Sequence, residues 1–263
     1  MSTDSIYITR WGQSGPRVVM VHGSAQGSKV GGDRHFSAQE SLGAEGLQVI
    51  VPDRPGHGRS ASPGRPDDAE VDGEWVAEIL GDGAHLVGHS FGGCVALAAA
   101  AKRPEAVLSL TLIEPGMQKL AMDDPAVRKF GLKMLMVVFL SISAEARAAR
   151  FAKLVRIPAE IRGGSDRQEL AEMGQAIARL KIPSRETLER ELTIVRLSAI
   201  PLLTITGGWS LAFDATGRRV ASIGGGKHML IKSEHHFPHL VFDEFNRVFL
   251  SFVRDRVLRS IEN

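Results

Sequence analysis

The stretch HLVGHSFGGCVALAAA, residues 85–100, sets a serine between glycines where an apolar run stops and an alanine-rich run begins. The run at 85–87 predicts a buried strand, and the alanine-rich segment predicts a helix. A serine pushed out at such a corner needs small neighbours, because side chains at Gly88 and Gly92 would collide with nearby backbone. The pattern G-x-S-x-G between a strand and a helix is typical of a nucleophile elbow, and a tight turn is the alternative. The flanking segments favour Ser90 as a nucleophile.

Apolar runs and helix-like segments alternate along the rest of the chain. Most runs are continuously apolar, which is typical of strands buried on both faces of a parallel sheet, and residues 6–11 suit an edge strand. Alternation of this kind predicts an α/β fold with right-handed crossovers. The predicted strands are residues 6–11, 18–21, 49–51, 85–87, 108–113, 202–206 and 228–231. The predicted helices are residues 35–46, 70–80, 91–103, 214–222 and 238–258.

The segment 117–197 has no strong strand pattern and predicts only helices, interrupted by proline and glycine. We interpret it as a helical cap inserted into a core formed by residues 1–116 and 198–263. Five of the eight methionines fall in the cap, and methionine suits irregular apolar pockets. Apolar side chains here predict an apolar substrate pocket, and packing in the protein core is the alternative.

Composition and charge restrict the class of protein. The net charge is +2 and there is no long basic run, so nothing predicts a nucleic-acid surface. The first residues lack a basic region followed by an apolar one, and the longest strongly apolar stretch, 134–142, is too short to span a bilayer. The single cysteine, Cys94, excludes an internal disulfide and a thiolate metal cluster. We therefore expect a cytoplasmic protein without a membrane span, and its oligomeric state stays open.

A candidate oxyanion loop occurs in VVMVHGSAQGS, residues 18–28, where a predicted strand ends at His22-Gly23. An elbow needs two N–H donors for the negative charge that develops on the substrate oxygen. The N–H of Phe91, at the start of the predicted helix, is the first candidate. The N–H of Ser24 is the second, because the preceding glycine lets the backbone approach closely. A glycine turn after a strand is the alternative.

Together these motifs resemble those of α/β-hydrolases with a cap, of the esterase, lactonase and C–C hydrolase type. The resemblance rests on His22-Gly23, VPDRPGHGRS at 51–60, GHSFGG at 88–93 and SEHHFPH at 233–239, in this order. It covers both core segments, whereas the cap carries no signature. It implies an eight-stranded, mostly parallel sheet with helices on both faces, and a Ser–His–acid triad in the chain order nucleophile, acid, histidine. It also implies chemistry that needs no metal and no organic cofactor.

The resemblance places the catalytic histidine after the last strand and before the final helix. HMLIK at 228–232 is that strand, and Pro238 would open the helix. His236 aligns with the pattern His-Phe-Pro-His and is the favoured base, with its neighbour His235 as the alternative. His89 occupies the variable position of the elbow and is expected to pack or cap beside the nucleophile.

The acid is where the sequence departs from the family's usual pattern. The usual Gly-x-x-Asp turn after the penultimate strand reads Gly-Gly-Trp-Ser at 207–210, with serine in the acid's place. Asp214 comes four residues later and is predicted to be the N-cap of the next helix. Glu114 follows the strand at 108–113, beside the crevice at the carboxyl ends of the strands, where some family members carry their acid. Glu114 is therefore the favoured acid and Asp214 the alternative.

The favoured interpretation is a serine hydrolase that cleaves a small-molecule carboxylic ester or lactone through an acyl-enzyme on Ser90, with His236 as base and Glu114 as acid. Hydrolysis of a C–C bond in a diketone-like substrate would use the same triad, and a cofactor-free haloperoxidase-type or lyase activity is a further alternative. A non-catalytic ligand sensor is the alternative from a different class. The residues predicted to line the substrate pocket are His22, Gly23, His89, Met136, Phe139 and Trp209.

Overall fold

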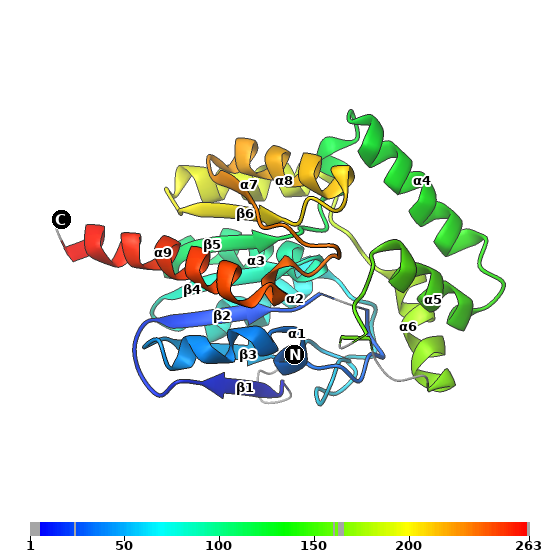
Figure 1. Cartoon of the computed structure of the whole chain (residues 1–263), viewed down its shortest axis with the longest axis horizontal. Coiled ribbons are helices and arrows are strands. Elements are labelled where there is room, and N and C mark those ends of the chain that lie inside the picture. The colour runs from blue at the N-terminus through cyan, green and yellow to red at the C-terminus, as the bar shows by residue number, and fades with distance from the viewer. Residues whose placement is uncertain (1–5, 24, 160, 163–165, 262–263) are drawn as a thin grey trace.

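The computed structural model describes residues 6–23, 25–159, 161, 162 and 166–261, with side chains through residue 254. One sheet forms the middle layer of the molecule, and helices cover both of its faces (Figure 1). The α/β fold class predicted from the alternation of strands and helices is therefore confirmed.

The sheet has seven strands within the described residues, in the order β1-β3-β2-β4-β5-β6-β7. Strand β1 pairs antiparallel with β3, and all other neighbouring strands pair in parallel. The resemblance implied eight strands. The described residues form seven. The strands are β1 Ile8–Trp11, β2 Arg17–Val21, β3 Gln48–Pro52, β4 Ala84–His89, β5 Val107–Ile113, β6 Leu202–Thr206 and β7 Lys227–Leu230.

Helices follow the strands in the expected alternation. The α-helices are α1 Gly32–His35, α2 Ala69–Ile79, α3 Phe91–Lys102, α4 Pro125–Phe139, α5 Ala144–Leu154, α6 Arg167–Arg179, α7 Arg185–Leu197, α8 Leu211–Gly224 and α9 Phe242–Ile261. Short 3-10 turns are η2 Ser37–Gly43, η3 Pro104–Ala106, η4 Gln118–Ala121 and η5 Pro238–Leu240.

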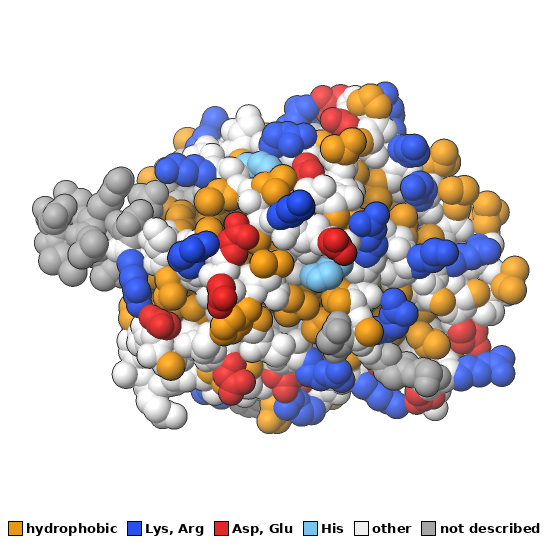
Figure 2. All heavy atoms as spheres, in the orientation of Figure 1, with side chains coloured by type: hydrophobic (Ala, Val, Ile, Leu, Met, Phe, Trp, Pro, Cys, Tyr) orange, Lys and Arg blue, Asp and Glu red, His pale blue; other side chains and the backbone are white. Residues whose placement is uncertain are grey.

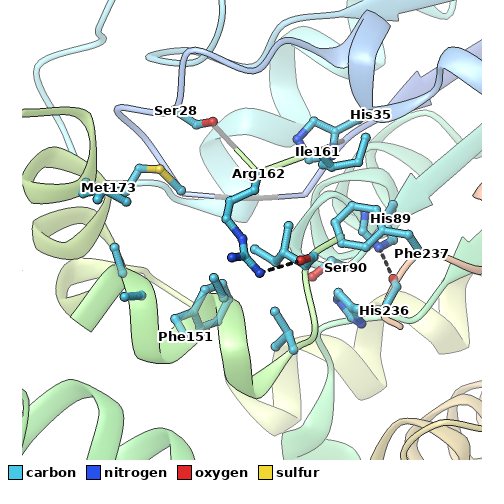
Figure 3. Close-up of a pocket in the computed structure, with 16 residues that line it drawn as sticks. Ser28, His35, His89, Ser90, Phe151, Ile161, Arg162, Met173, His236 and Phe237 are labelled. Carbon is cyan, nitrogen blue, oxygen red and sulfur yellow. Dashed lines mark hydrogen bonds between the residues drawn. The ribbon is translucent and has the colours of Figure 1, made fainter. Parts of the chain in front are cut away.

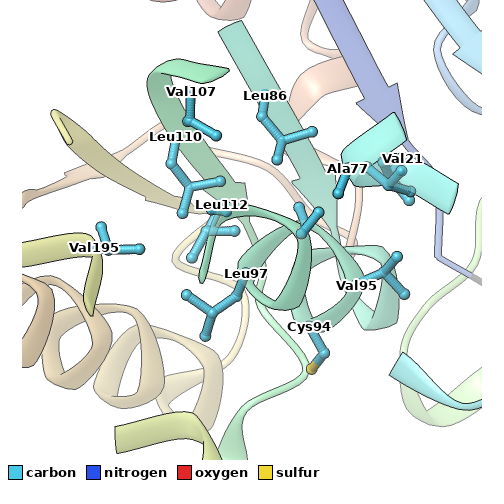
Figure 4. Close-up of a cluster of buried hydrophobic side chains, with 14 of the residues drawn as sticks. Val21, Ala77, Leu86, Cys94, Val95, Leu97, Val107, Leu110, Leu112 and Val195 are labelled. Atoms are coloured by element: carbon cyan, nitrogen blue, oxygen red, sulfur yellow. The ribbon is translucent and has the colours of Figure 1, made fainter. Parts of the chain in front are cut away.

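Strands β2 to β6 are largely buried on both faces, which explains their continuously apolar sequences. Successive residues of a strand point to opposite faces. On β2, Val19 and Val21 join one apolar cluster, whereas Val18 and Met20 join another. The first cluster packs the sheet against α2, α3 and α7 (Figure 4), and the second packs it against α9. A strand covered on both sides therefore has apolar residues at most of its positions.

Helices α4 to α7 lie between β5 and β6 in the chain, within the segment 117–197 predicted as a cap. Asp124, Ser143 and Asp166 begin α4, α5 and α6, each accepting a hydrogen bond from a first-turn N–H. Helices α5 and α6 lie beyond the carboxyl ends of the strands, and α4 extends along the upper right in Figure 1. Helix α7 differs, because its Leu192 belongs to the buried cluster on the sheet. The segment thus combines three outlying helices with one helix of the core layer.

Candidate active site

Ser90 is the single residue between β4 and α3, and its backbone is strained. Its φ is +56°, in the left-handed region that side chains other than glycine rarely adopt. Such a conformation costs about 1–3 kcal/mol and persists only where the surroundings hold it. Here the Ser90 N–H donates to the Ile113 carbonyl at 2.9 Å, and the Ser90 carbonyl accepts from the N–H groups of Gly93 and Gly116, both at 3.0 Å. The half-buried Ser90 side chain is thereby held at the corner.

The glycines around Ser90 leave no room for a side chain. A Cβ on Gly92 would lie 2.3 Å from the Val21 carbonyl oxygen, and one on Gly88 would lie 2.5 Å from the Gly92 carbonyl oxygen. A Cβ on Gly23 would lie 2.7 Å from Cβ of Ser90. The backbone of three segments therefore converges on the serine, as the pattern G-x-S-x-G predicts.

His236 lies in the loop between β7 and η5 and is almost fully buried. Its Nδ1 is 3.2 Å from Oε2 of Glu114, and its carbonyl accepts a 2.8 Å hydrogen bond from Nε2 of His89. The ring packs against Phe213, with 4.5 Å between the ring centroids. These contacts fix the ring with one nitrogen toward a carboxylate and leave Nε2 for other chemistry.

Glu114 directly follows β5 and is fully buried. Its Oε1 accepts a 2.6 Å hydrogen bond from the N–H of Gly207, and its Oε2 faces His236. A lone buried carboxylate is costly, so these two partners account for its position. The backbone of Glu114 also adopts a positive φ of +45°, which turns the chain at the end of the strand.

Asp214 occupies a different position from the one its sequence predicts. The N-cap prediction is wrong: α8 begins at Leu211 with Ser210 in the N-cap position, so Asp214 lies in the first turn. Its buried carboxylate accepts a 3.3 Å hydrogen bond from the N–H of Gly208. The helix begins earlier because the chain leaves β6 through a short glycine turn.

The side chain of His235 forms hydrogen bonds within its own loop. Its Nδ1 accepts a 3.2 Å hydrogen bond from the N–H of Phe237 and lies 3.0 Å from the Ser233 hydroxyl oxygen. The ring is half-buried, and it does not line the cavity that contains Ser90. Of the two neighbouring histidines, the structure brings His236 to both Glu114 and this cavity.

His89 is neutral and lies next to the serine. Burial, reinforced by the nearby His239 ring, holds its pKa well below the ordinary histidine value. Because Nε2 donates to the His236 carbonyl, Nδ1 carries no proton, and it has no hydrogen-bond partner among the described residues. The residue that was expected to pack beside the nucleophile therefore also supports the backbone of His236.

A cavity of about 300 Å³ opens over Ser90 (Figure 3). Ser90, His89 and His236 face it from the core, and α5 and α6 cover it from the outlying layer. Apart from these three residues, the lining is mostly apolar. It comprises Ser28, His35, Ala148, Ala149, Phe151, Ala152, Val155, Ile157, Ile161, Arg162, Leu170, Met173 and Phe237.

Most of the residues predicted to line the pocket lie elsewhere. Met136 and Phe139 are exposed on α4, because this helix buries Val127 and Val137 on its opposite side. Trp209 packs beside His236, with 5.9 Å between the ring centroids, instead of lining the cavity. Of the other three predicted residues, His89 lines the cavity, whereas His22 and Gly23 do not.

The α5 side of the cavity was missed by sequence reasoning. Ala148, Phe151, Ala152 and Val155 recur at the spacing of one helix face and line the cavity together. A face of small and apolar residues at this spacing is a signal that could have been found. It does not say whether the face covers a core or a ligand.

The predicted oxyanion donors lie at the start of α3 and after Gly23. As the first residue of α3, Phe91 has an N–H with no acceptor within the helix. The imidazole of His22 donates from Nδ1 to the Gly23 carbonyl at 2.7 Å and accepts from the Arg54 N–H at 2.9 Å, so it holds this turn. Ser24, the predicted second donor, lies outside the described residues.

A buried cation supports both of these segments. The Arg54 guanidinium lies 4.7 Å from the centroid of the Phe91 ring and 3.5 Å from the Gly23 carbonyl oxygen. Asp67 and Asp72, both buried, balance its charge. No three His, Cys, Asp or Glu side chains of the described residues are grouped so that they could hold a metal ion.

Comparisons with known proteins agree with this architecture. Residues 16–172 match the family described as the alpha/beta hydrolase fold. Lipase LipV of Mycobacterium tuberculosis (strain ATCC 25618 / H37Rv) is 36% identical over 152 residues, covering 55% of this chain and 54% of that protein. The 2-hydroxy-6-oxo-6-phenylhexa-2,4-dienoate hydrolase of Burkholderia cepacia is 32% identical over 152 residues, covering 55% and 51%. The chain thus matches about half the length of these curated relatives.

A solved structure is similar over almost the whole chain. The N-acyl homoserine lactonase AidH complexed with N-butanoyl homoserine superposes with a TM-score of 0.68 at 19% identity, covering 95% of this chain and 93% of that one. At this identity the likeness concerns the fold.

Proposed function

Because the chain belongs to the alpha/beta hydrolase fold family, we propose that it is a serine hydrolase that cleaves a carboxylic ester or lactone through an acyl-enzyme on Ser90. One observation carries the proposal: the strained Ser90 and His236 line one cavity, and Nδ1 of His236 lies 3.2 Å from the buried Glu114 carboxylate. A nucleophile, a base and a group that orients the base are the three parts that such catalysis requires.

The proposed reaction proceeds in two acyl-transfer steps. Nε2 of His236 takes the Ser90 proton while Oγ attacks the substrate carbonyl carbon. The same imidazole gives this proton to the leaving alkoxide, and an acyl-enzyme results. His236 then deprotonates a water molecule that attacks the acyl-enzyme, which releases the carboxylic acid and returns the proton to Ser90. Glu114 keeps the imidazole oriented and stabilises its charged form.

The negative charge that develops on the carbonyl oxygen needs preorganised donors. The N–H of Phe91 at the start of α3 is the proposed first donor, favoured by the positive end of the helix dipole. The N–H of Ser24 remains the predicted second donor. Loss of one such donor typically raises the barrier by roughly 3–4 kcal/mol.

The volume and the apolar lining of the cavity favour a substrate with an apolar acyl group of moderate size. Its volume of about 300 Å³ is at the lower end for small-molecule sites. We propose that α4, α5 and α6 form the cap, and that the face of α5 with Phe151 and Val155 contacts the acyl chain.

Hydrolysis of a C–C bond is the second candidate. The relative from Burkholderia cepacia is named for a dienoate, an acidic substrate. The Arg162 guanidinium borders the cavity, where it would attract such a carboxylate (Figure 3). The two candidates are separated by measuring kcat/KM for neutral aryl esters and for an acidic vinylogous diketone. An ester hydrolase should favour the esters, and a C–C hydrolase should favour the diketone.

Labelling of the nucleophile tests the proposed function. A fluorophosphonate probe should react with the wild type at Ser90, and Ser90→Ala should remain unlabelled. His236→Ala should label at least about a hundredfold more slowly, because the base that activates the hydroxyl is lost. His235→Ala is the matched control and should label at nearly the wild-type rate. A wild type that neither labels nor hydrolyses short esters would favour the ligand-sensor alternative instead.

A further inference from the structure

Helix α4 exposes large apolar side chains that the proposed chemistry does not use. We call this surface the α4 face and define it as Leu132, Leu135, Met136, Phe139, Leu140 and Ile142. Phe139 is 75% exposed and Ile142 is 93% exposed. Single exposed apolar residues are common, but a contiguous group of this kind marks an interaction surface.

The spacing of these residues creates the exposed stripe. Leu132, Leu135, Met136 and Phe139 follow the i, i+3, i+4, i+7 pattern of a single helix face. The opposite side of α4 is already occupied, because Val127 and Val137 are buried there. The α4 face therefore points away from the protein, and the turn that follows α4 forms the right-hand margin in Figure 1.

Basic residues surround the α4 face. Residues 125–156 contain seven Lys or Arg and a single acidic residue, Glu145, whereas the whole chain carries a net charge of only +2. Lys129, Lys133 and Lys153 are exposed, and no ion pair within the described residues involves them. Figure 2 shows orange and blue side chains together along the right side, where α4 and α5 lie in Figure 1.

Two copies of this chain would repel each other at such a surface. Each copy would bring a strongly positive segment to the contact, and like charges in an interface are unfavourable. A surface of anionic phospholipid complements both properties, since its headgroups attract Lys and Arg and its acyl boundary accepts Leu and Phe side chains.

We propose that the α4 face docks on the surface of an anionic phospholipid bilayer, with α4 lying in the interface. No helix in the described part of the chain is long and apolar enough to cross a bilayer, so the contact is peripheral. Helix α5 packs beside α4 and lines the cavity, so docking brings the cavity next to the lipid surface. The proposal goes beyond hydrolysis and does not depend on it.

Vesicle flotation tests this docking without any activity measurement. The purified protein is mixed with vesicles of phosphatidylcholine alone, or with about one third phosphatidylglycerol, at low and at high salt. We expect binding to the anionic vesicles that weakens with salt. Phe139→Ser should weaken binding about tenfold or more, because it removes a large inserted side chain. Lys133→Glu should weaken it at least about fivefold, the approximate effect of one basic residue near such a surface.

Matched variants outside the α4 face control for general surface effects. Leu197→Ser removes an equally exposed apolar side chain at the end of α7, and Lys227→Glu reverses an exposed charge at the start of β7. Both should bind vesicles as the wild type does. Absence of binding, or equal binding to neutral and anionic vesicles, would overturn the proposal. A dimer in light scattering that Phe139→Ser dissociates, together with no vesicle binding, would assign the α4 face to a second copy.

Discussion

Glu114 and His236 are 122 positions apart in the chain, yet Oε2 of Glu114 lies 3.2 Å from Nδ1 of His236. The contact arises because β5 and β7 both flank β6 and run parallel to it, so the segments that follow β5 and β7 begin at the same end of the sheet. Parallel strands bring their carboxyl ends together, which is where α/β proteins assemble their sites. The remaining oxygen of Glu114 is held by the Gly207 N–H from the turn after β6.

Replacing Glu114 by Gln should reduce kcat by roughly 10²–10⁴, because the amide neither stabilises the imidazolium nor keeps the ring in the correct tautomer. KM should change much less, since Glu114 does not line the cavity. Steady-state hydrolysis of an aryl ester measures both quantities. Asp214→Asn, the matched control on α8, should lose much less activity. A larger loss in Asp214→Asn than in Glu114→Gln would refute the assignment of the acid.

Gly92→Ala should destabilise the protein by about 3 kcal/mol, the upper range for overpacking, because the new Cβ meets backbone oxygens that cannot rotate away. Gly131→Ala is the control on α4. Its Cβ would meet only the end of the Met122 side chain, at 3.9 Å, so it should stabilise the helix by about 0.5–1 kcal/mol. Urea denaturation compares the two variants. Equal changes in the free energy of unfolding would contradict the close backbone packing around Ser90.

Ala152→Phe should shorten the acyl chain that the cavity accepts, because residue 152 lines it from α5. The kcat/KM for an octanoyl ester should fall about tenfold or more, whereas an acetyl ester should be affected little. Lys153→Phe adds the same side chain on the exposed side of α5 and should leave the chain-length preference unchanged. An unchanged preference in Ala152→Phe would place the acyl group elsewhere.

Glu191 should make stability depend on pH. This residue of α7 is 5% exposed, and burial, with a smaller contribution from Glu70, raises the pKa of its carboxyl from 4.5 to about 7. Between pH 4.5 and 7 the folded protein keeps the proton that the unfolded chain has released. The free energy of unfolding therefore falls as pH rises through this window, by roughly 3 kcal/mol in total.

Glu191→Gln removes this titration and should be more stable than the wild type at pH 8, with little difference below pH 4.5. The difference between variant and wild type cancels the other groups that titrate in this range. Urea denaturation at several pH values measures it. Glu189→Gln, an exposed neighbour on α7 that pairs with Arg185, should follow the wild-type profile. An identical profile for Glu191→Gln would show that the carboxyl is solvated.

Local features of the fold could be read from adjacent residues. The elbow depends on Gly88 and Gly92 next to Ser90, and the strained φ of +56° follows from the sharp reversal between β4 and α3. The buried strands appear as continuous apolar runs because both faces of the sheet are covered. These properties involve neighbours in the chain, so a sequence pattern contains them.

Contacts between segments that are far apart in the sequence could be identified only from the tertiary structure. Whether Glu114 or Asp214 meets His236 depends on the register of β5 and β7 against β6, with Ile113 opposite Ile205 and Thr206 opposite Leu230. The apolar pattern of α4 also fits either a pocket or a surface, and packing of Val127 and Val137 turned Met136 and Phe139 outward. Periodicity identifies a helix face, but only its neighbours in space determine what that face contacts.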